Sequence, residues 1–201
     1  MTHRFDKGFW DQHWQEGRAG GSPPNPYLAQ EIGDLPAGTA LDAGCGAGAE
    51  ARWLAAAGWE VTAADISSEA LARAAASDAA ARVRWVQADL SVWDPGTQFD
   101  LVTTHYAHPA IPQLDFYERI AAWVAPGGTL LIVGHLHTHD GHGHGHRPPA
   151  EASATAAAVT ARLDDTRWDV VTAGERRRTL TGPDGHEVSL DDVVVRATRR
   201  H

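Results

Sequence analysis

An alternation of short apolar runs with glycine- and alanine-rich stretches most constrains what this chain can fold into. Residues 39–43 (TALDA) lead into the glycine-rich GCGAG, and the alanine-rich AEARWLAAAGW follows and stops at Gly58. Helix-like stretches, SSEALARAAAS and QLDFYERIAAWVAP among them, separate further apolar runs at 60–65, 82–89, 99–105 and 127–134. Strands that alternate with helices form right-handed crossovers and a mostly parallel sheet covered on both faces. The sequence therefore predicts an α/β fold.

The last third of the chain follows a different pattern. ASATAAAVTARLDD is typical of a helix, and the strand-like runs WDVVTAGERRR and EVSLDDVVVRATRR come after it, separated by TGPDGH. Pro-Asp-Gly is a tight-turn sequence, so two strands joined in this way pair as an antiparallel hairpin. We expect this hairpin at one end of the sheet.

Length and composition favour one domain with an extension. The chain has 201 residues, of which 43% are hydrophobic, enough for one core. Residues 1–26 are rich in aromatic residues, glycine and proline, which predicts an arm or lid, and residues 27–201 form the predicted domain. No apolar run reaches the roughly 20 residues that span a bilayer, no secretion signal is apparent, and the single cysteine allows no disulfide framework. We expect a cytoplasmic monomer or homodimer without membrane contact.

The stretch LDAGCGAGAEA contains the first candidate binding site. Gly44, Gly46 and Gly48 allow a tight turn and the close approach of a ligand, and the amides of the next helix can hold an anionic group. Cys45 reads as a small buried residue within this turn. The motif alone leaves the ligand open, because Gly44, Gly46 and Ala49 also fit the dinucleotide fingerprint G-x-G-x-x-A.

Three aspartates, each at the end of a predicted strand, narrow the choice. Asp42 suits an ammonium group rather than a pyrophosphate, Asp65 can accept the hydroxyls of a ribose, and Asp89 with the amide of Leu90 can bind adenine. Taken singly, the glycines could be ordinary turn residues, Asp42 and Asp65 strand-end caps, and Asp89 an exposed loop acid. Together, at the carboxyl ends of successive strands, they predict S-adenosylmethionine rather than NAD, and the chain lacks the Tyr-x-x-x-Lys pair of NAD-dependent oxidoreductases.

At these motifs the sequence resembles the class I S-adenosylmethionine-dependent methyltransferases. The matching stretches are ALDAGCGAG, VTAADIS, VQADL, FDLVTTHYAH and WVAPGGTLLIVGH. The resemblance implies a Rossmann-like, seven-stranded, mostly parallel sheet that ends in the antiparallel hairpin. It also implies that S-adenosyl-L-methionine contacts Asp42, Gly44, Cys45, Gly46, Gly48, Asp65, Ile66, Asp89, Leu90 and Thr104. The N-terminal arm and the C-terminal hairpin are similar to small bacterial thiopurine and tellurite-resistance methyltransferases, which implies a small acceptor with a sulfur, nitrogen, oxygen or metalloid nucleophile.

The segment after the fourth predicted strand bears on the acceptor. It reads Thr104-His105-Tyr106-Ala107-His108-Pro109, without the Asn/Asp-Pro-Pro-aromatic motif of enzymes that methylate DNA bases. The formal net charge of −9 also disfavours nucleic acid. His105 and His108 are candidate bases and Tyr106 a candidate ligand contact, because these side chains follow the strand that faces the reacting methyl group. The alternative is that one histidine only binds the backbone of its own loop.

The arm supplies two further candidates for contact with the cofactor. Trp10 and Trp14 are four residues apart, so they share one face of a helical turn. Such a face could cover the cofactor and exclude water, since aromatic rings tolerate a sulfonium cation, and the arm would then order on binding. Ordinary hydrophobic cover of the domain is the alternative.

Residues 135–149 form a histidine-rich loop with six histidines: His135, His137, His139, His142, His144 and His146. The glycines between them favour a flexible loop with loose metal affinity over a fixed metal centre, and no metal site is predicted. A lid over the acceptor and metal-dependent chemistry are the alternatives, with His135 the member nearest the site. A protein that binds metal or metalloid without catalysis is the competing function.

Overall fold

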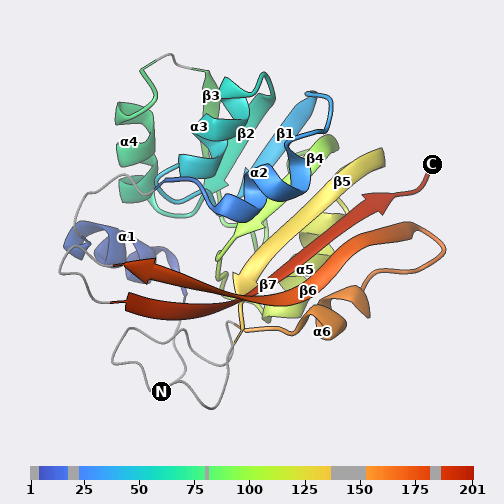
Figure 1. Ribbon diagram of the computed structural model, residues 1–201. Coiled ribbons are helices and arrows are strands. Elements are labelled where there is room, and N and C mark those ends of the chain that lie inside the picture. The colour runs from blue at the N-terminus through green and yellow to red at the C-terminus, as the bar shows by residue number, and fades with distance from the viewer. Residues whose placement is uncertain (1–4, 18–22, 80–81, 137–152, 182–186) are drawn as a thin grey trace.

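The computed structural model describes residues 5–17, 23–79, 82–136, 153–181 and 187–201 (Figure 1). Its centre is a seven-stranded sheet in the order β3-β2-β1-β4-β5-β7-β6. The strands are β1 (Thr39–Ala43), β2 (Glu60–Asp65), β3 (Val83–Gln87), β4 (Phe99–His105), β5 (Val124–His135), β6 (Trp168–Thr181) and β7 (Glu187–Arg199). The first five are parallel, and β7 pairs antiparallel with both β5 and β6. The predicted α/β, Rossmann-like fold with its C-terminal hairpin is confirmed.

Helices cover both faces of the sheet, as predicted (Figure 1). They are α1 (Lys7–Glu16), α2 (Pro26–Ile32), α3 (Ala49–Ala56), α4 (Ser68–Ala76), α5 (Gln113–Ala121) and α6 (Ala156–Thr160). Side chains alternate along each strand, so β5 contributes Leu131 to the core under α2 and α3, and Leu130 to the core under α5 and α6. The sheet is therefore buried on both sides, and its strand ends are left as the place for a site.

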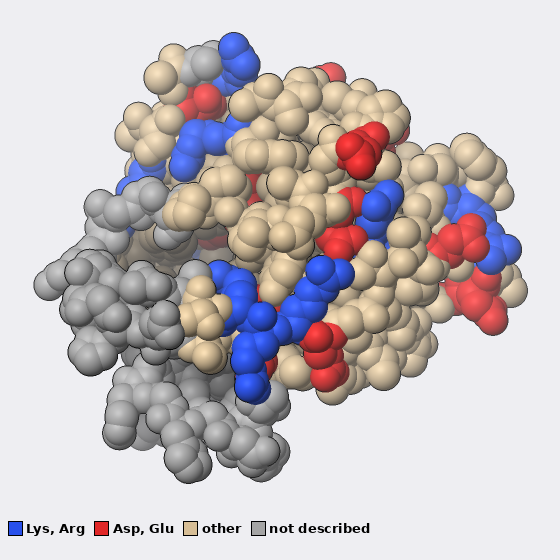
Figure 2. Space-filling view, in the orientation of Figure 1, with Lys and Arg blue, Asp and Glu red and all other residues tan. Residues whose placement is uncertain are grey.

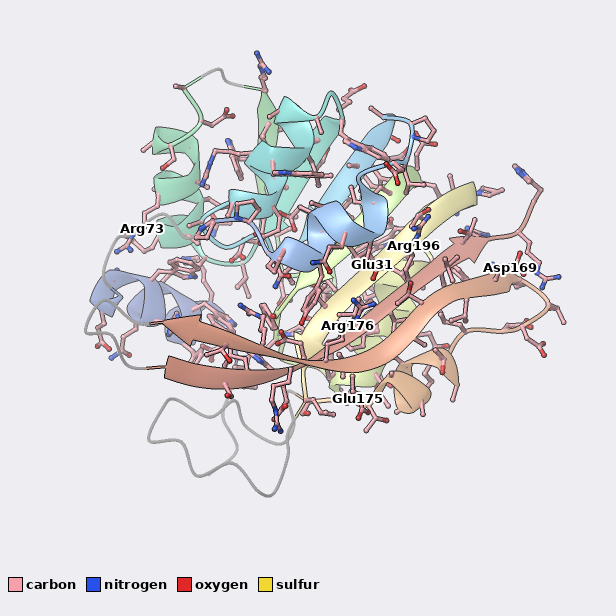
Figure 3. The ribbon with its side chains drawn as sticks, viewed as in Figure 1. Glu31, Arg73, Asp169, Glu175, Arg176 and Arg196 are labelled. Atoms are coloured by element: carbon pink, nitrogen blue, oxygen red, sulfur yellow. The ribbon has the colours of Figure 1, made fainter. Side chains whose placement is uncertain are left out.

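Helix α2 is fixed to the hairpin by a buried acid. Glu31 accepts hydrogen bonds from Arg176 Nη2 at 3.1 Å and Thr172 Oγ1 at 2.8 Å, and its backbone carbonyl accepts one from Arg196 Nη1 at 2.5 Å. Figure 3 shows Glu31, Arg176 and Arg196 gathered between α2 and the strands β6 and β7. Figure 2 shows basic and acidic side chains intermixed over the same face. These arginines therefore serve the packing of the domain.

Several element ends differ from the prediction. β3 ends at Gln87 rather than at residue 89, because Asp89 Oδ1 accepts hydrogen bonds from the amide and the hydroxyl of Ser91 and turns the chain. β5 starts earlier than predicted, and α6 is much shorter than the predicted helix. The arm contains a ten-residue helix, α1, because Asp6 caps the amide of Phe9, and all the prolines of the arm and all its glycines except Gly8 come after the helix.

Within the described ranges, none of the helices has both the length and the hydrophobicity that a bilayer crossing requires.

Candidate functional site

A cavity of about 510 Å³ lies at the carboxyl ends of the parallel strands, below α1. Its volume is within the range of small-molecule sites in proteins. Thirteen of the residues predicted for the site line it: Trp10, Trp14, Gly44, Cys45, Gly46, Gly48, Asp65, Ile66, Asp89, Leu90, His105, Tyr106 and His108. Asp42 and Thr104 are buried behind the wall, where Thr104 Oγ1 donates to the carbonyl of Ala43 at 2.8 Å.

The cavity has two distinct ends. The glycine-loop end comprises Gly44–Ala49 with the strand-end residues Asp65, Ile66, Asp89 and Leu90. The aromatic end comprises Phe5, Phe9, Trp10, Tyr106, His108 and His135. The first is built by consecutive residues and strand ends, and the second by rings from α1, the segment after β4 and the end of β5.

The loop between β1 and α3 has glycine at positions where a Cβ would clash. Gly44 has a φ of 80°, and a Cβ there would lie 2.2 Å from the Cβ of Ala107. Gly46 has a φ of 50°, and a Cβ there would lie 2.9 Å from Cζ2 of Trp14. Gly48 caps α3 without a side-chain hydrogen bond, and the third amide of the helix, that of Ala51, already bonds to Asp42. The first two amides of this helix are therefore the ones open to an anionic group. The loop therefore presents backbone groups, rather than side chains, to a ligand in the cavity.

Asp65 and Asp89 retain free hydrogen-bonding capacity toward the cavity. Asp65 accepts from the amides of Gly46 at 2.8 Å and Ser67 at 2.9 Å, one at each carboxylate oxygen, and also from the amide of Ile66, so at least one of its four lone pairs is left for a ligand. Burial raises the pKa of Asp65. Asp89 uses only Oδ1 for the amide and hydroxyl of Ser91 in the described structure, so Oδ2 can accept from a ligand.

Cys45 is a buried thiol of the loop, as predicted from its position in the turn. It is 5% exposed, and its amide donates to the carbonyl of Ala64 at 3.1 Å. Burial raises the pKa of the thiol, with the charges of Asp42 and Asp65 adding to the effect. A protonated thiol is a poor nucleophile, so Cys45 supplies packing and backbone to the glycine loop.

Tyr106 is held by a polar network that the sequence did not reveal. Its hydroxyl donates to Asp192 Oδ1 at 2.9 Å and accepts from Arg178 Nη2 at 2.8 Å and Asn25 Nδ2 at 3.0 Å. Asp192 is fully buried and pairs with Arg178 Nε at 2.6 Å. Tyr106 has a φ of 56°, an uncommon value for a non-glycine residue. Burial raises its pKa, and its ring stacks on His135 with centroids 4.4 Å apart.

His108 has a defined tautomer. Gln113 Nε2 donates to the carbonyl of Ala107 at 3.0 Å, which fixes the orientation of the amide. Gln113 Oε1, 3.2 Å from His108 Nδ1, is then the acceptor, so Nδ1 carries the hydrogen and Nε2 has a lone pair. Burial lowers the pKa of His108. Near neutral pH this imidazole is therefore an uncharged acceptor at the aromatic end.

Two further histidines of the cavity, His105 and His135, are also neutral near neutral pH. Burial lowers the pKa of His105 and of His135 to about 4. His105 Nδ1 lies 3.4 Å from Thr103 Oγ1, and its buried Nε2 has no hydrogen-bond partner among the described residues. Rings and uncharged imidazoles therefore make up the part of the cavity that follows β4 and β5.

Helix α1 closes the cavity from above. Trp10 Nε1 donates to the carbonyl of His108 at 3.2 Å, at the aromatic end, while the ring of Trp14 lies against Gly46 at the glycine-loop end. Asp11 Oδ1 accepts from Ser67 Oγ at 2.7 Å, which joins the arm to the residue that binds Asp65. The aromatic spacing in FDKGFWDQHW predicted two tryptophans here. Phe9 belongs to the same aromatic run and was also a candidate, whereas Phe5, four residues before it, carried the same spacing and was missed.

The histidine-rich loop lies largely outside the described residues, which include only His135 and Leu136 of it. His135 lines the aromatic end. Among the residues that the structure describes, no group of three or more His, Cys, Asp or Glu side chains could hold a metal ion. The predicted roles of the remaining histidines stay predictions.

The sequence has relatives among methyltransferases. Residues 40–128 match the family described as "Methyltransferase domain". An uncharacterized methyltransferase of Mycobacterium tuberculosis is 39% identical over 103 residues, 49% of this chain and 52% of that protein. A "Probable thiol methyltransferase 2" of Arabidopsis thaliana is 29% identical over 150 residues, 65% of each protein. The chain thus matches about half the length of the first of these curated relatives.

Solved structures share the fold. The N-methyltransferase NodS of Bradyrhizobium japonicum, in complex with S-adenosylhomocysteine, has a TM-score of 0.69 at 18% identity, over 96% of this chain and 99% of that one. TehB of Haemophilus influenzae has a TM-score of 0.70 at 14% identity, over 97% of this chain and 67% of that one. Both likenesses cover nearly all of this chain.

Proposed function

We propose that this chain, which is similar to methyltransferases in sequence and to S-adenosylmethionine-dependent methyltransferases in fold, transfers a methyl group from S-adenosylmethionine to a small-molecule acceptor. One observation carries the proposal: the glycine loop, Asp65 and Asp89 line one end of a single cavity, and uncharged rings and imidazoles line the other. The first end suits a polar nucleoside ligand and the second a small organic or metalloid acceptor.

The residues of the glycine-loop end fit S-adenosylmethionine on two structural grounds. The loop has a backbone cradle that a Cβ would fill, and the buried Asp42 has a carboxylate oxygen, Oδ2, without a partner among the described residues. In our proposal the loop and the α3 amides bind the methionine moiety, Asp65 the ribose hydroxyls, and Asp89 with Leu90 the adenine. S-adenosylmethionine supplies the activated methyl group when bound. The protein contributes mainly orientation, which is a large part of catalysis in transfers of this kind.

His108 is the proposed proton acceptor. Its Nε2 has a lone pair at the aromatic end, and its tautomer is set by Gln113. An acceptor that carries a proton on its nucleophile would hydrogen-bond to Nε2 and transfer the proton there as the methyl group arrives. Tyr106 contributes its ring, because its hydroxyl is held by Asp192, Arg178 and Asn25.

The arm, residues 1–26, is proposed as the lid of this site. α1 places Trp10 and Trp14 over both ends of the cavity, where they would exclude water from the reacting groups. Asp11 links this lid to Ser67 beside the proposed ribose site. Residues 27–201 form the domain that the lid covers.

The acceptor is proposed to be a small molecule with a sulfur, nitrogen, oxygen or metalloid nucleophile. The uncharged lining of the aromatic end favours a neutral molecule over a polyanion. Together with the net charge of −9, it also disfavours nucleic acid. One curated relative carries the name thiol methyltransferase and one structural neighbour the name N-methyltransferase, so sulfur and nitrogen acceptors come first in a test.

A screen for release of S-adenosylhomocysteine tests the proposal. The full chain is incubated with S-adenosylmethionine and, in turn, with thiols, amines, phenols and metalloid oxyanions. We expect turnover with at least one class, and loss of turnover in the Asp65→Ala variant. Absence of turnover, together with absence of S-adenosylhomocysteine binding and tight binding of Ni²⁺ or Zn²⁺, would instead favour the metal-binding alternative.

A further inference from the structure

The hairpin of β6 and β7 extends beyond the strand that it pairs with. In the described structure the β5–β7 ladder ends at Asp192, whereas the β6–β7 ladder continues for five further residues of β7, to Glu187. Residues 177–181 and 187–191 form this hairpin overhang. Figure 1 shows the two strands reaching past the end of β5 toward α1. The overhang therefore lies on the side of the molecule where α1 covers the cavity.

The two faces of the hairpin overhang have different surroundings. Leu190 is the cross-strand partner of Arg178, and Asp192 follows two residues later on β7, so these three side chains share a face. On that face Arg178 Nη2 donates to the hydroxyl of Tyr106 at 2.8 Å, and Leu190 lines the same cavity as Tyr106. Ser189 points to the opposite face and is exposed. One face of the overhang therefore meets the cavity and the other meets solvent.

Buried polar contacts fix the position of the inner face. Asp192 is fully buried and accepts from Arg178 Nε at 2.6 Å and from the hydroxyl of Tyr106 at 2.9 Å. Asn25 Nδ2 donates to the same hydroxyl at 3.0 Å. Hydrogen bonds that include a charged group are stronger than those between neutral groups, so the hairpin is held firmly against the segment that follows β4. Leu190, directly across from Arg178, is held in place by the same contacts.

Leu190 differs in kind from the rest of the cavity wall. Among the described residues that line the cavity, it alone comes from β6 or β7. Its side chain has no polar atom, so it can neither hold the nucleophile of an acceptor nor take a proton from it. It can only contact the body of a molecule and limit the space that this molecule occupies. Its contribution to the site is therefore one of size and shape.

We propose that Leu190 is a specificity-determining residue that limits the size of the acceptor at the aromatic end. A larger acceptor would have to displace Leu190, and the hairpin cannot retreat without breaking the contacts of Arg178 and Asp192 with Tyr106. A smaller side chain at this position makes room, and a larger one fills the space. This inference rests on the proposed function and names a residue that selects among the acceptors.

An analogue of S-adenosylmethionine with a larger group on its sulfonium tests the proposal before an acceptor is known. The transferable group points from the glycine-loop end toward the aromatic end in our proposal, so an S-benzyl analogue places a ring in the acceptor space. Calorimetry measures the binding of this analogue and of S-adenosylhomocysteine. The proteins are the full chain and its Leu190→Ala, Leu190→Trp and Ser189→Trp variants. Ser189→Trp is the matched control, because it adds the same ring to the exposed face of the hairpin overhang.

S-adenosylhomocysteine should bind all four proteins within a factor of about two. We expect Leu190→Ala to bind the S-benzyl analogue about tenfold more tightly than the wild type, and Leu190→Trp to bind it at least about tenfold more weakly. Ser189→Trp should match the wild type.

The deciding quantity is the affinity for the S-benzyl analogue relative to that for S-adenosylhomocysteine. If this ratio does not rise in Leu190→Ala, the size-limiting role of Leu190 is overturned, and the proposed function stands as long as S-adenosylhomocysteine binds. Failure of S-adenosylhomocysteine to bind the wild type would overturn both. Circular dichroism shows whether each variant is folded, and Leu190→Ala decides the question even where the tryptophan variant does not fold.

Discussion

The two ends of the cavity are built in different ways. The glycine-loop end is made by one contiguous stretch and the ends of neighbouring parallel strands, and its contacts are largely from backbone groups. The aromatic end is assembled from α1, the segment after β4, the end of β5 and the hairpin, and its contacts are from side chains. The glycine-loop end depends on positions that require glycine, whereas the aromatic end depends on pairs of residues far apart in sequence. A substitution that damages one end of the cavity should therefore leave the other end intact.

The largest expected effect is on stability, from loss of the ion pair between Arg178 and Asp192 that holds Tyr106 at the aromatic end. Arg178→Met leaves Asp192 as a fully buried carboxylate without its ion pair and removes a hydrogen bond to Tyr106. The free energy of unfolding should fall by about 3 kcal/mol, as measured by chemical denaturation. Arg177→Met is the control, because its pair with Asp191 is 68% exposed on the arginine side. It should change stability by less than about 1 kcal/mol, and equal losses in the two variants would contradict the account.

The next effect concerns chemistry at the aromatic end. His108→Phe keeps the ring beside Trp10 but removes Nε2, the proposed proton acceptor. For an amine or phenol acceptor, kcat should fall about 100-fold, equivalent to about 2.7 kcal/mol. S-adenosylhomocysteine affinity should not change. The control is His13→Phe, another histidine that lines the cavity, which should keep kcat within a factor of a few. A loss of cofactor affinity in His108→Phe would mean that the two ends are not separate.

A smaller effect is expected in the glycine loop. Gly44→Ala combines a positive φ with a Cβ that meets Ala107 at 2.2 Å, so the loop must move. We expect about 2 kcal/mol less stability and at least tenfold weaker binding of S-adenosylhomocysteine. Gly96→Ala is matched, because Gly96 has a φ of 67° but no atom within 4 Å of the added Cβ. It should lose only about 1 kcal/mol and keep its affinity. The same affinity in both variants would show that the loop does not bind the ligand.

The smallest effect is a dependence on pH. Burial lowers the pKa of His135 to about 4 in the folded chain, below its ordinary 6.5. Between these values the unfolded state binds more protons, so this residue makes stability rise with pH through the window, by at most about 1.4 kcal/mol per pH unit. His135→Phe should therefore reduce the slope of unfolding free energy between pH 4 and 6.5. Burial raises the pKa values of Asp42 and Asp65, so these groups make stability fall as pH rises. Because both proteins contain them, their contribution drops out when the two slopes are compared. An unchanged slope would contradict the burial of His135.

The contrast between the two ends also explains what the sequence could predict. The bounds of β1, β2 and β4 match the predicted runs, because buried parallel strands are continuous apolar stretches bounded by polar or glycine residues. The glycine loop and the strand-end aspartates were readable for the same reason, since each is a local pattern. The end of β3 was predicted two residues too late, because the turn made by Asp89 and Ser91 depends on side-chain geometry.

The polar network of the aromatic end could not be read in this way. Tyr106 meets Asn25, Arg178 and Asp192, which are 81, 72 and 86 residues away in the chain. No spacing rule links such residues, and their pairing follows only from the strand order. Glu50, which lines the cavity beside the glycine loop, was missed because an acid in the first turn of a helix is ordinarily explained by the helix dipole.

The central claim is that the glycine-loop end binds S-adenosylmethionine, although its glycine spacing also fits a dinucleotide. Calorimetric titration of the full chain with S-adenosylhomocysteine, and separately with NAD⁺, tests it most directly. The account predicts saturable binding of one S-adenosylhomocysteine per chain and no detectable binding of NAD⁺. Binding of NAD⁺ without binding of S-adenosylhomocysteine would contradict it.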